Sequence, residues 1–245
     1  FLLALITWIT VRHRIAPPTQ PSLSKQSLRT QLAVILSSRQ AWITALYGLL
    51  MYTPFLSLIT LWGPTFFAQV HPELSKPLAA WYSSFMLFGF MLGAPTLGAM
   101  ADWTQQRKLP MWIASIGQLL SLSSALLFTK QLPILGLVGL WTLTGFFTSG
   151  FVPAFSIIKE AHPKHLEGTS MGFMNTWNQV GAALALPAIG WLIGHAHTLL
   201  VKDPWQLYLS PYQFALILLP TLTLCACILL PLIQETHCHS TRSTG

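Results

Sequence analysis

The sequence predicts an all-α polytopic membrane protein, built as a six-transmembrane-helix bundle. Of its 245 residues, 53% are hydrophobic and only 8% are charged, whereas soluble domains carry about 25% charged residues. The mean hydropathy is positive, at +0.57. Apolar segments also recur along the chain, each with at least the roughly 20 residues that a bilayer span needs. A soluble protein with so few charges could not cover its surface, so the lipid bilayer is the expected surrounding.

The apolar segments divide the chain into four parts. Residues 1–10 are predicted to be the end of a truncated transmembrane helix, because an apolar run opens the sequence without a preceding basic segment. Residues 11–38 form a basic linker, residues 39–234 a six-helix bundle, and residues 235–245 a polar tail. The six predicted spans are Ala41–Val70, Leu78–Ala101, Leu109–Phe128, Leu132–Ile158, Gly168–Gly194 and Tyr212–Ile233.

The second half of the linker, Ser27–Ser38, has the pattern of a short amphipathic helix. Leu28, Leu32, Ile35 and Leu36 fall on one side of it. We expect this helix to lie along the membrane surface rather than to cross the bilayer.

Orientation follows from the basic residues, because cytoplasmic loops of membrane proteins are enriched in Lys and Arg. If the linker is cytoplasmic, that side carries ten basic residues and the other side carries three, Lys76, Lys130 and Lys202. The linker and the C-terminus are therefore predicted to be cytoplasmic. The net charge of +7 is then a topology signal, and no nucleic-acid partner is expected because the bases lie in short loops.

The most informative loop joins the second and third full spans. It runs from Gly98 through Asp102 and Trp103 to Arg107 and Lys108. A loop this short forces an antiparallel helical hairpin. Upstream of it, Gly89-x-x-x-Gly93 places small residues on one face, where another helix can pack closely.

This loop resembles the signature of the major facilitator superfamily of solute carriers, Gly-x-x-x-Asp, a basic residue, a Gly and two basic residues. Leu61-Trp62-Gly63-Pro64 and the stretch from Glu167 to Asn175 resemble bacterial members that carry small organic solutes. The resemblance implies one half of a twelve-helix major facilitator fold, with an N-terminal six-helix half as partner. The chain departs from the signature where Trp103 and Gln106 replace basic residues and Gln105 replaces the Gly.

The resemblance also implies a state lock between two halves. Asp102 would contact an Arg or a helix N-terminus in the cytoplasmic layer in one conformational state only, with Gly98, Arg107 and Lys108 around it. The alternative is that Asp102 ends a helix while Arg107 and Lys108 only set the topology. Because the basic set is incomplete, a weak state-setting contact is expected rather than a strong latch.

The fifth span is the most polar, with Asn175, Asn178 and Gln179 within about one helical turn. Unpaired polar groups are costly in lipid, so these amides should face the bundle interior or a water-filled path. They are predicted to form a wall of the substrate cavity; hydrogen bonding between helices is the alternative.

Two further spans contribute candidate residues. Trp141, Thr144 and Thr148 share a face of the fourth span, although the threonines could also bond their own helix backbone. In the first span, Tyr47 and Tyr52 are candidates for the cavity or a gate, or for ordinary packing. Pro54 and Pro153 are expected to bend their helices near the transport site.

No ionisable residue lies well inside a predicted span, so a proton relay is not expected in this half. Lys159 and Glu160 are expected to form a surface pair of small value. No metal or cofactor is predicted, because His237-Cys238-His239 and the pair His195 and His197 lack four-ligand spacing. An enzyme is not expected either, since hydrolase and phosphate-binding motifs are absent.

The function predicted from these observations is secondary active transport of a small organic solute by alternating access, by a symporter or an exchanger. The expected location is a bacterial inner membrane. The alternative is a non-transporting receptor or sensor on the carrier fold.

Overall fold

The computed structural model describes residues 27–200 and 210–236, without the side chains of residues 197–200. Within these ranges the chain is helical, and six segments are long and apolar enough to cross a membrane. They are Arg39–Val70, Lys76–Thr104, Lys108–Leu127, Ile134–Glu160, Lys164–Ala196 and Pro211–Leu232. Each predicted span lies within four residues of these bounds. The predicted fold class is therefore confirmed, whereas residues 1–10, the first part of the linker and most of the tail lie outside the described residues.

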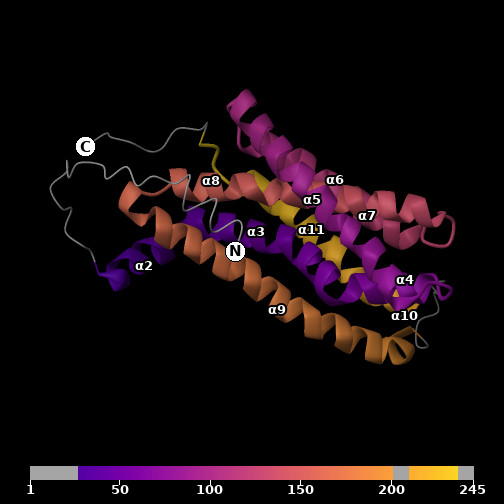
Figure 1. Ribbon diagram of the computed structural model, residues 1–245. Coiled ribbons are helices and arrows are strands. Elements are labelled where there is room, and N and C mark those ends of the chain that lie inside the picture. The colour runs from indigo at the N-terminus through magenta and orange to yellow at the C-terminus, as the bar shows by residue number, and fades with distance from the viewer. Residues whose placement is uncertain (1–26, 201–209, 237–245) are drawn as a thin grey trace, which may run out of the picture.

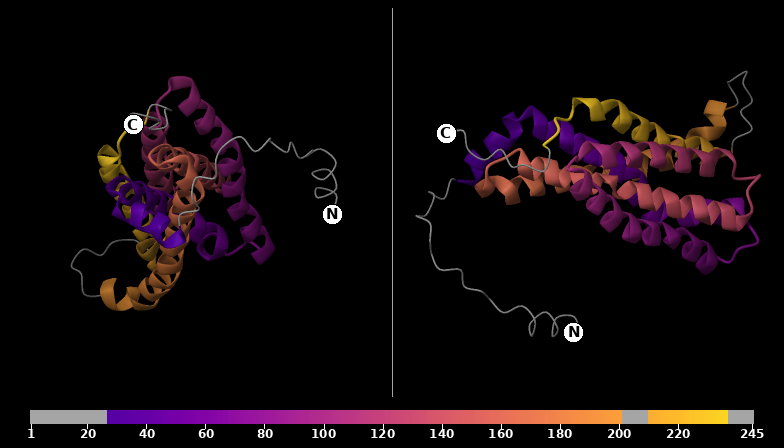
Figure 2. Two further views of the ribbon diagram at one scale, coloured as in Figure 1. Left: turned by 90° about the vertical axis from the view of Figure 1, so that its left-hand side faces the viewer. Right: turned by 90° about the horizontal axis from the view of Figure 1, so that it is seen from above.

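The long helices run side by side along one axis (Figures 1 and 2). The first span comprises α3 (Arg39–Ser57), a π-helical turn (Leu58–Trp62) and α4 (Gly63–Val70). It is followed by α5 (Lys76–Thr104), α6 (Lys108–Leu127), α7 (Ile134–Thr148) with α8 (Val152–Glu160), α9 (Glu167–Leu200), and α10 (Pro211–Leu216) with α11 (Leu218–Leu229).

Helix packing places α5 and α9 at the edges of the bundle. The chief neighbour of α5 is α7, and the chief neighbour of α9 is α3. Of the remaining long helices, α6 packs against α7, and α11 packs against both α3 and α6. Only 28% of the apolar 18-residue stretch of the α5 and α9 spans is buried, against 61% for the first span. One surface of each edge helix is thus left uncovered by the rest of the described chain.

Glycines allow α5 and α7 to meet backbone to backbone. A Cβ atom on Gly89 would lie 2.8 Å from both the carbonyl carbon of Thr142 and the amide nitrogen of Phe146. Gly93 and Gly145 are equally close to the backbone of the facing helix. The predicted close-packing face that begins at Gly89-x-x-x-Gly93 is therefore confirmed.

Three of the described spans are interrupted, and two of the interruptions lie close to a proline. In the fourth span a 3₁₀ turn (Ser149–Phe151) separates α7 from α8, and Pro153 stands in the first turn of α8, where its missing N–H does not break a helical bond. The interruption expected at Pro153 is thus present. Pro54, by contrast, lies inside a continuous α3, and the irregularity follows as the π-helical turn Leu58–Trp62. The last span is broken at Ile217, three residues before Pro220.

The linker helix α2 (Leu28–Ser37) begins at Ser27, whose side chain accepts a hydrogen bond from the amide of Thr30. Only part of its predicted apolar side is buried against the bundle. Ile35 is fully buried, but Leu28, Leu32 and Leu36 remain exposed. The reason is that its main neighbours within the described residues, α3 and α9, cover one narrow strip of it. The hydroxyl of Thr169 on the α9 side donates to Gln31 over 2.7 Å.

Candidate functional site

The signature loop turns at Gln105. This residue ends α5 with a left-handed backbone, at φ 53°, a conformation that glycine adopts most easily. The position is the one where the family signature has its Gly, so the backbone accounts for the preference even though Gln105 stands here. The side-chain amide of Gln105 donates to the carbonyl of Asp102 over 2.6 Å, which holds the turn closed.

Arg107 lies at the centre of an ion-pair network at this end of the bundle. One guanidinium nitrogen is 2.7 Å from Asp102 and the other is 2.9 Å from Glu160, the last residue of α8. The side chains of Arg107 and Glu160 are only 12% and 14% exposed, whereas that of Asp102 is 71% exposed. Arg107 therefore ties the α5–α6 loop to the fourth span.

This network corrects the expectation for Glu160. Lys159 and Glu160 do not form a pair of their own; Lys159 pairs with Glu167 over 3.5 Å. Successive residues of a helix point about 100° apart, so Lys159 faces α9 while Glu160 faces Arg107. The helical period could have separated the two residues, but the nearness of Arg107 depends on how α6 and α8 pack.

Residues 234–236 form a second set of contacts at the same end, here called the C-terminal clasp. The carboxylate of Glu235 accepts hydrogen bonds from the amides of Arg107 and Lys108, at 2.9 and 2.8 Å. It thereby satisfies two of the free N–H groups at the start of α6. The hydroxyl of Thr236 donates to Glu160, and Lys108 donates to the carbonyl of Pro231 over 3.3 Å.

The clasp also reaches the first span. The side chain of Gln40 donates to the carbonyl of Gln234 and accepts from its amide, both at 3.1 Å. Sequence reasoning missed Glu235 because it treated residues 235–245 as a free tail. The available signal was an acidic residue directly after the last apolar run, where it can reach the N-terminus of another helix.

Four predicted cavity residues lie inside the helix packing of this half. Tyr47 is fully buried, and its hydroxyl is 3.0 Å from that of Ser115 on α6. Trp141 is also fully buried, stacked on Phe66 at 5.4 Å and edge-on to Phe67 at 5.2 Å.

Thr144 and Thr148 are buried in the same packing. Thr144 contacts Ser121 at 3.0 Å and donates to the carbonyl of Leu140 at 2.9 Å. Thr148 donates to the carbonyl of Thr144 over 2.9 Å. Both hydroxyls are thus satisfied within the bundle, and the cavity role of these residues stays a prediction.

The three amides of α9 do not share one environment. Asn175 and Gln179 are exposed, but Asn178 is 1% exposed and lies against Gly48 of α3. Asn178 therefore faces the bundle interior, as expected for these amides, whereas Asn175 and Gln179 are not covered by the described part of the chain. Asn178 is rotated by about 60° from Asn175 and about 100° from Gln179, which turns it into the α3–α9 contact.

Tyr52 differs from the other aromatic candidate of its helix because it is only partly buried. It lies 4.8 Å from Phe151 and 5.8 Å from Phe55, measured between ring centroids. Phe90 joins this group, at 4.9 Å from Phe55 and 6.0 Å from Phe151. These four rings come from α3, α5 and the 3₁₀ turn, and we call them the aromatic cluster. They connect the interruption of the fourth span to the first and second spans.

The described residues contain no group of three or more His, Cys, Asp and Glu side chains that could hold a metal. His195 lies on α9 with its ring stacked on Trp191 at 4.5 Å. The side chain of His197 and the run His237-Cys238-His239 lie outside the described residues.

Comparisons with known proteins agree with this geometry. The structure is similar to the inward-open conformation of the xylose transporter XylE from E. coli, with a TM-score of 0.61 and 15% sequence identity. The match covers 84% of this chain and 48% of that transporter, so the chain spans about half the length of this structural relative. A search of curated proteins finds no match. The sequence model of the Major Facilitator Superfamily matches residues 1–185 and 71–240. The chain therefore belongs to the Major Facilitator Superfamily, whose fold is that of membrane transporters.

Proposed function

We propose that this chain forms the C-terminal half of a secondary transporter that moves a small organic solute by alternating access. The supporting observation is the set of small and polar residues that nothing in the described chain covers. No atom lies within 4 Å of a Cβ built on Gly98, Gly168 or Gly172, and Asn175 and Gln179 are exposed nearby along α9. Amides facing lipid are costly, so a second six-helix half is proposed to cover them.

The solute path is proposed to run between the two halves, beside Tyr52 and the exposed amides of α9. No Asp, Glu, Lys, Arg or His lies inside the six predicted spans. Aromatic faces and amides suit an uncharged solute with hydroxyl groups, because each amide both donates and accepts hydrogen bonds. The similarity to a xylose transporter supports the same class of solute.

Asp102, Arg107 and Glu160 are proposed to form the state lock, on the cytoplasmic side of a bacterial inner membrane. Their ion pairs link the α5–α6 loop to the end of the fourth span, so a conformational change that separates α5 from α8 must break one of them. A partly buried ion pair of this kind contributes more than an exposed one, because solvent screens it less.

The lock is tested by Glu160→Gln in the complete transporter, with Glu167→Gln as the matched control. Both changes remove one carboxylate charge, but only Glu160 contacts Arg107. We expect Glu160→Gln to change the ratio of inward- to outward-open states by roughly five- to thirtyfold, which corresponds to 1–2 kcal/mol. Single-cysteine probes at the two gates measure this ratio. Equal probe accessibility in the two variants would show that the contact between Glu160 and Arg107 does not set the conformational state.

Transport itself is tested by uptake of labelled neutral solutes into vesicles that hold the complete protein. Saturable uptake of a sugar-like solute is expected, with a higher KM after Asn175→Ala or Gln179→Ala. Solute binding without flux would refute the carrier proposal and favour the receptor.

A further inference from the structure

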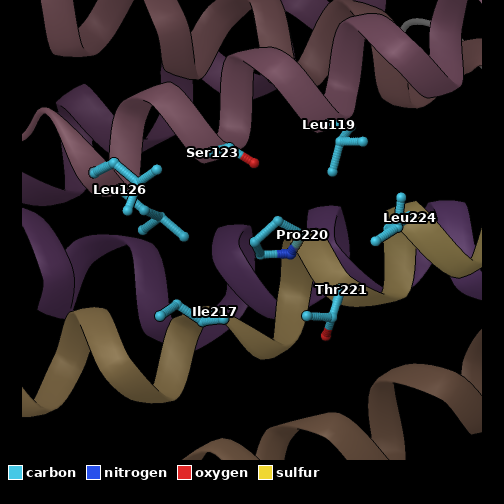
Figure 3. A pocket seen from close by; sticks show the side chains of 8 residues that line it. Leu119, Ser123, Leu126, Ile217, Pro220, Thr221 and Leu224 are labelled. Carbon is cyan, nitrogen blue, oxygen red and sulfur yellow. The ribbon is translucent and has the colours of Figure 1, made fainter. Parts of the chain in front are cut away.

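A groove on the outer side of the bundle lies between α6 and the last span. It has a volume of about 260 Å³ and is lined by Leu119, Ser123, Leu126, Leu127, Ile217, Pro220, Thr221 and Leu224. Figure 3 shows the side chains of the two helices facing one another across it. The hydroxyl of Thr221 is already bonded to the carbonyl of Leu218 over 2.7 Å, so the lining offers mainly apolar surface.

The backbone of the last span accounts for the groove. The helix is broken at Ile217, and Pro220 cannot donate the bond that would continue it. Two turns of α6 therefore face a span that is divided at the same level. The groove runs from Leu119 to Leu127, which is about 12 Å along the helix axis.

A second pocket, the polar pocket, lies near the groove at the end of α6. It measures about 300 Å³ and is lined by Gln69, Val70, His71, Thr129, Lys130, Leu132, Ser210 and Gln213. The two spaces share a wall, because the amide of Gln213 donates to the carbonyl of Leu126 over 2.8 Å. The apolar lining of the groove and the polar lining of the pocket thus meet where Gln213 contacts Leu126.

The polar pocket has the chemistry of a phosphate site. Lys130 supplies an exposed positive charge, and Ser210 supplies a hydroxyl. The Nε2 atom of His71 is buried without a hydrogen-bond partner. Its Nδ1 atom is 2.8 Å from the carboxylate of Glu73, which is 67% exposed and therefore weakens the local positive charge only partly.

From this arrangement we infer a binding site for one membrane phospholipid, with an acyl chain in the groove and the phosphate at Lys130 and His71. The groove is lined by residues of two candidate membrane spans, and the polar pocket lies at the end of α6 opposite to Arg107. This is the end that the positive-inside rule assigns to the outer surface. The inference is independent of the proposed solute and of the lock.

The experiment compares phospholipid retention by the purified complete protein, measured by native mass spectrometry with added phosphatidylglycerol. Lys130→Gln should lower retention about fivefold, which is the contribution of one Lys near an anionic lipid. Lys76→Gln is the matched control, since Lys76 is exposed on the same predicted side but lies outside both spaces. Ser123→Phe should lower retention by filling the groove, whereas Leu120→Phe, on the same helix but outside the lining, should not.

Three results would overturn the inference. The first is equal retention by the Lys130→Gln and Lys76→Gln variants, which would mean that the effect does not depend on which surface lysine is removed. The second is retention unchanged by Ser123→Phe, which would mean that the lipid does not occupy the groove, and the third is the absence of bound lipid on the unmodified protein. A preference for phosphatidylglycerol over phosphatidylcholine that disappears in Lys130→Gln would support it.

Discussion

Replacement of Gly89 by Ala tests the backbone contact between α5 and α7. The new Cβ would lie 2.8 Å from two backbone atoms of α7, and closer still to the carbonyl oxygen of Thr142. An ordinary contact needs at least 3.4 Å, so the helices must separate by more than about 0.6 Å. Neither partner is a flexible side chain that could move away, and we therefore expect the cost of an overpacked core, about 1–3 kcal/mol.

Gly139→Ala on α7 is the control, because Gly98 lies on the surface that the second half is proposed to cover. No atom lies within 4 Å of a Cβ at this position, and Ala favours a helix interior over Gly by about 1 kcal/mol. The preference for Ala applies to both glycines, so the two variants should differ by the overpacking cost, about 1–3 kcal/mol, or about 2–12 °C in Tm for a chain of this size. Thermal unfolding in detergent, followed by size-exclusion chromatography, measures the difference. Equal Tm values would refute the description of α5 and α7 as packed backbone to backbone.

Four further predictions follow from the same packing. Tyr47→Phe should cost about 1 kcal/mol of unfolding free energy without changing the KM for solute; an increased KM would instead place Tyr47 in the cavity. Trp141→Ala should cost about 3–5 kcal/mol, measured as a loss of Tm that the exposed Leu143→Ala does not show. Asn178→Ala should change stability by less than about 1 kcal/mol, because the buried Oδ1 atom has no partner to lose. Vesicles that hold only this 245-residue chain should show no saturable uptake, and robust uptake would indicate a functional homodimer.

The spans and the close-packing glycines could be predicted from the sequence because they depend on local properties. Apolar length fixes where a helix can cross the bilayer, and small residues four apart mark where another helix can approach. The same reasoning could not say which neighbour covers a face. The helical period predicts that Trp141 and Asn178 turn toward the bundle interior, but it could not indicate that Phe66 and Gly48 are their neighbours.

The lock residues illustrate the same limit over longer distances. Asp102 and Arg107 are close in sequence, so their contact was within reach of sequence reasoning. Glu160 and Glu235 are separated from Arg107 by 53 and 128 residues, and only the packing of α6, α8 and the last span brings them together. The π-helical turn at Leu58–Trp62 was also missed, since hydropathy is the same for α- and π-helical backbones.

The C-terminal clasp has a consequence for the order in which the protein is made. Residues 234–236 leave the ribosome after all six spans. During synthesis the amides of Arg107 and Lys108 therefore lack their hydrogen bonds to Glu235 until the last span has been made. Chains that stop before residue 235 would insert every span yet leave the start of α6 uncapped. The clasp contacts therefore form only after all six spans have been made.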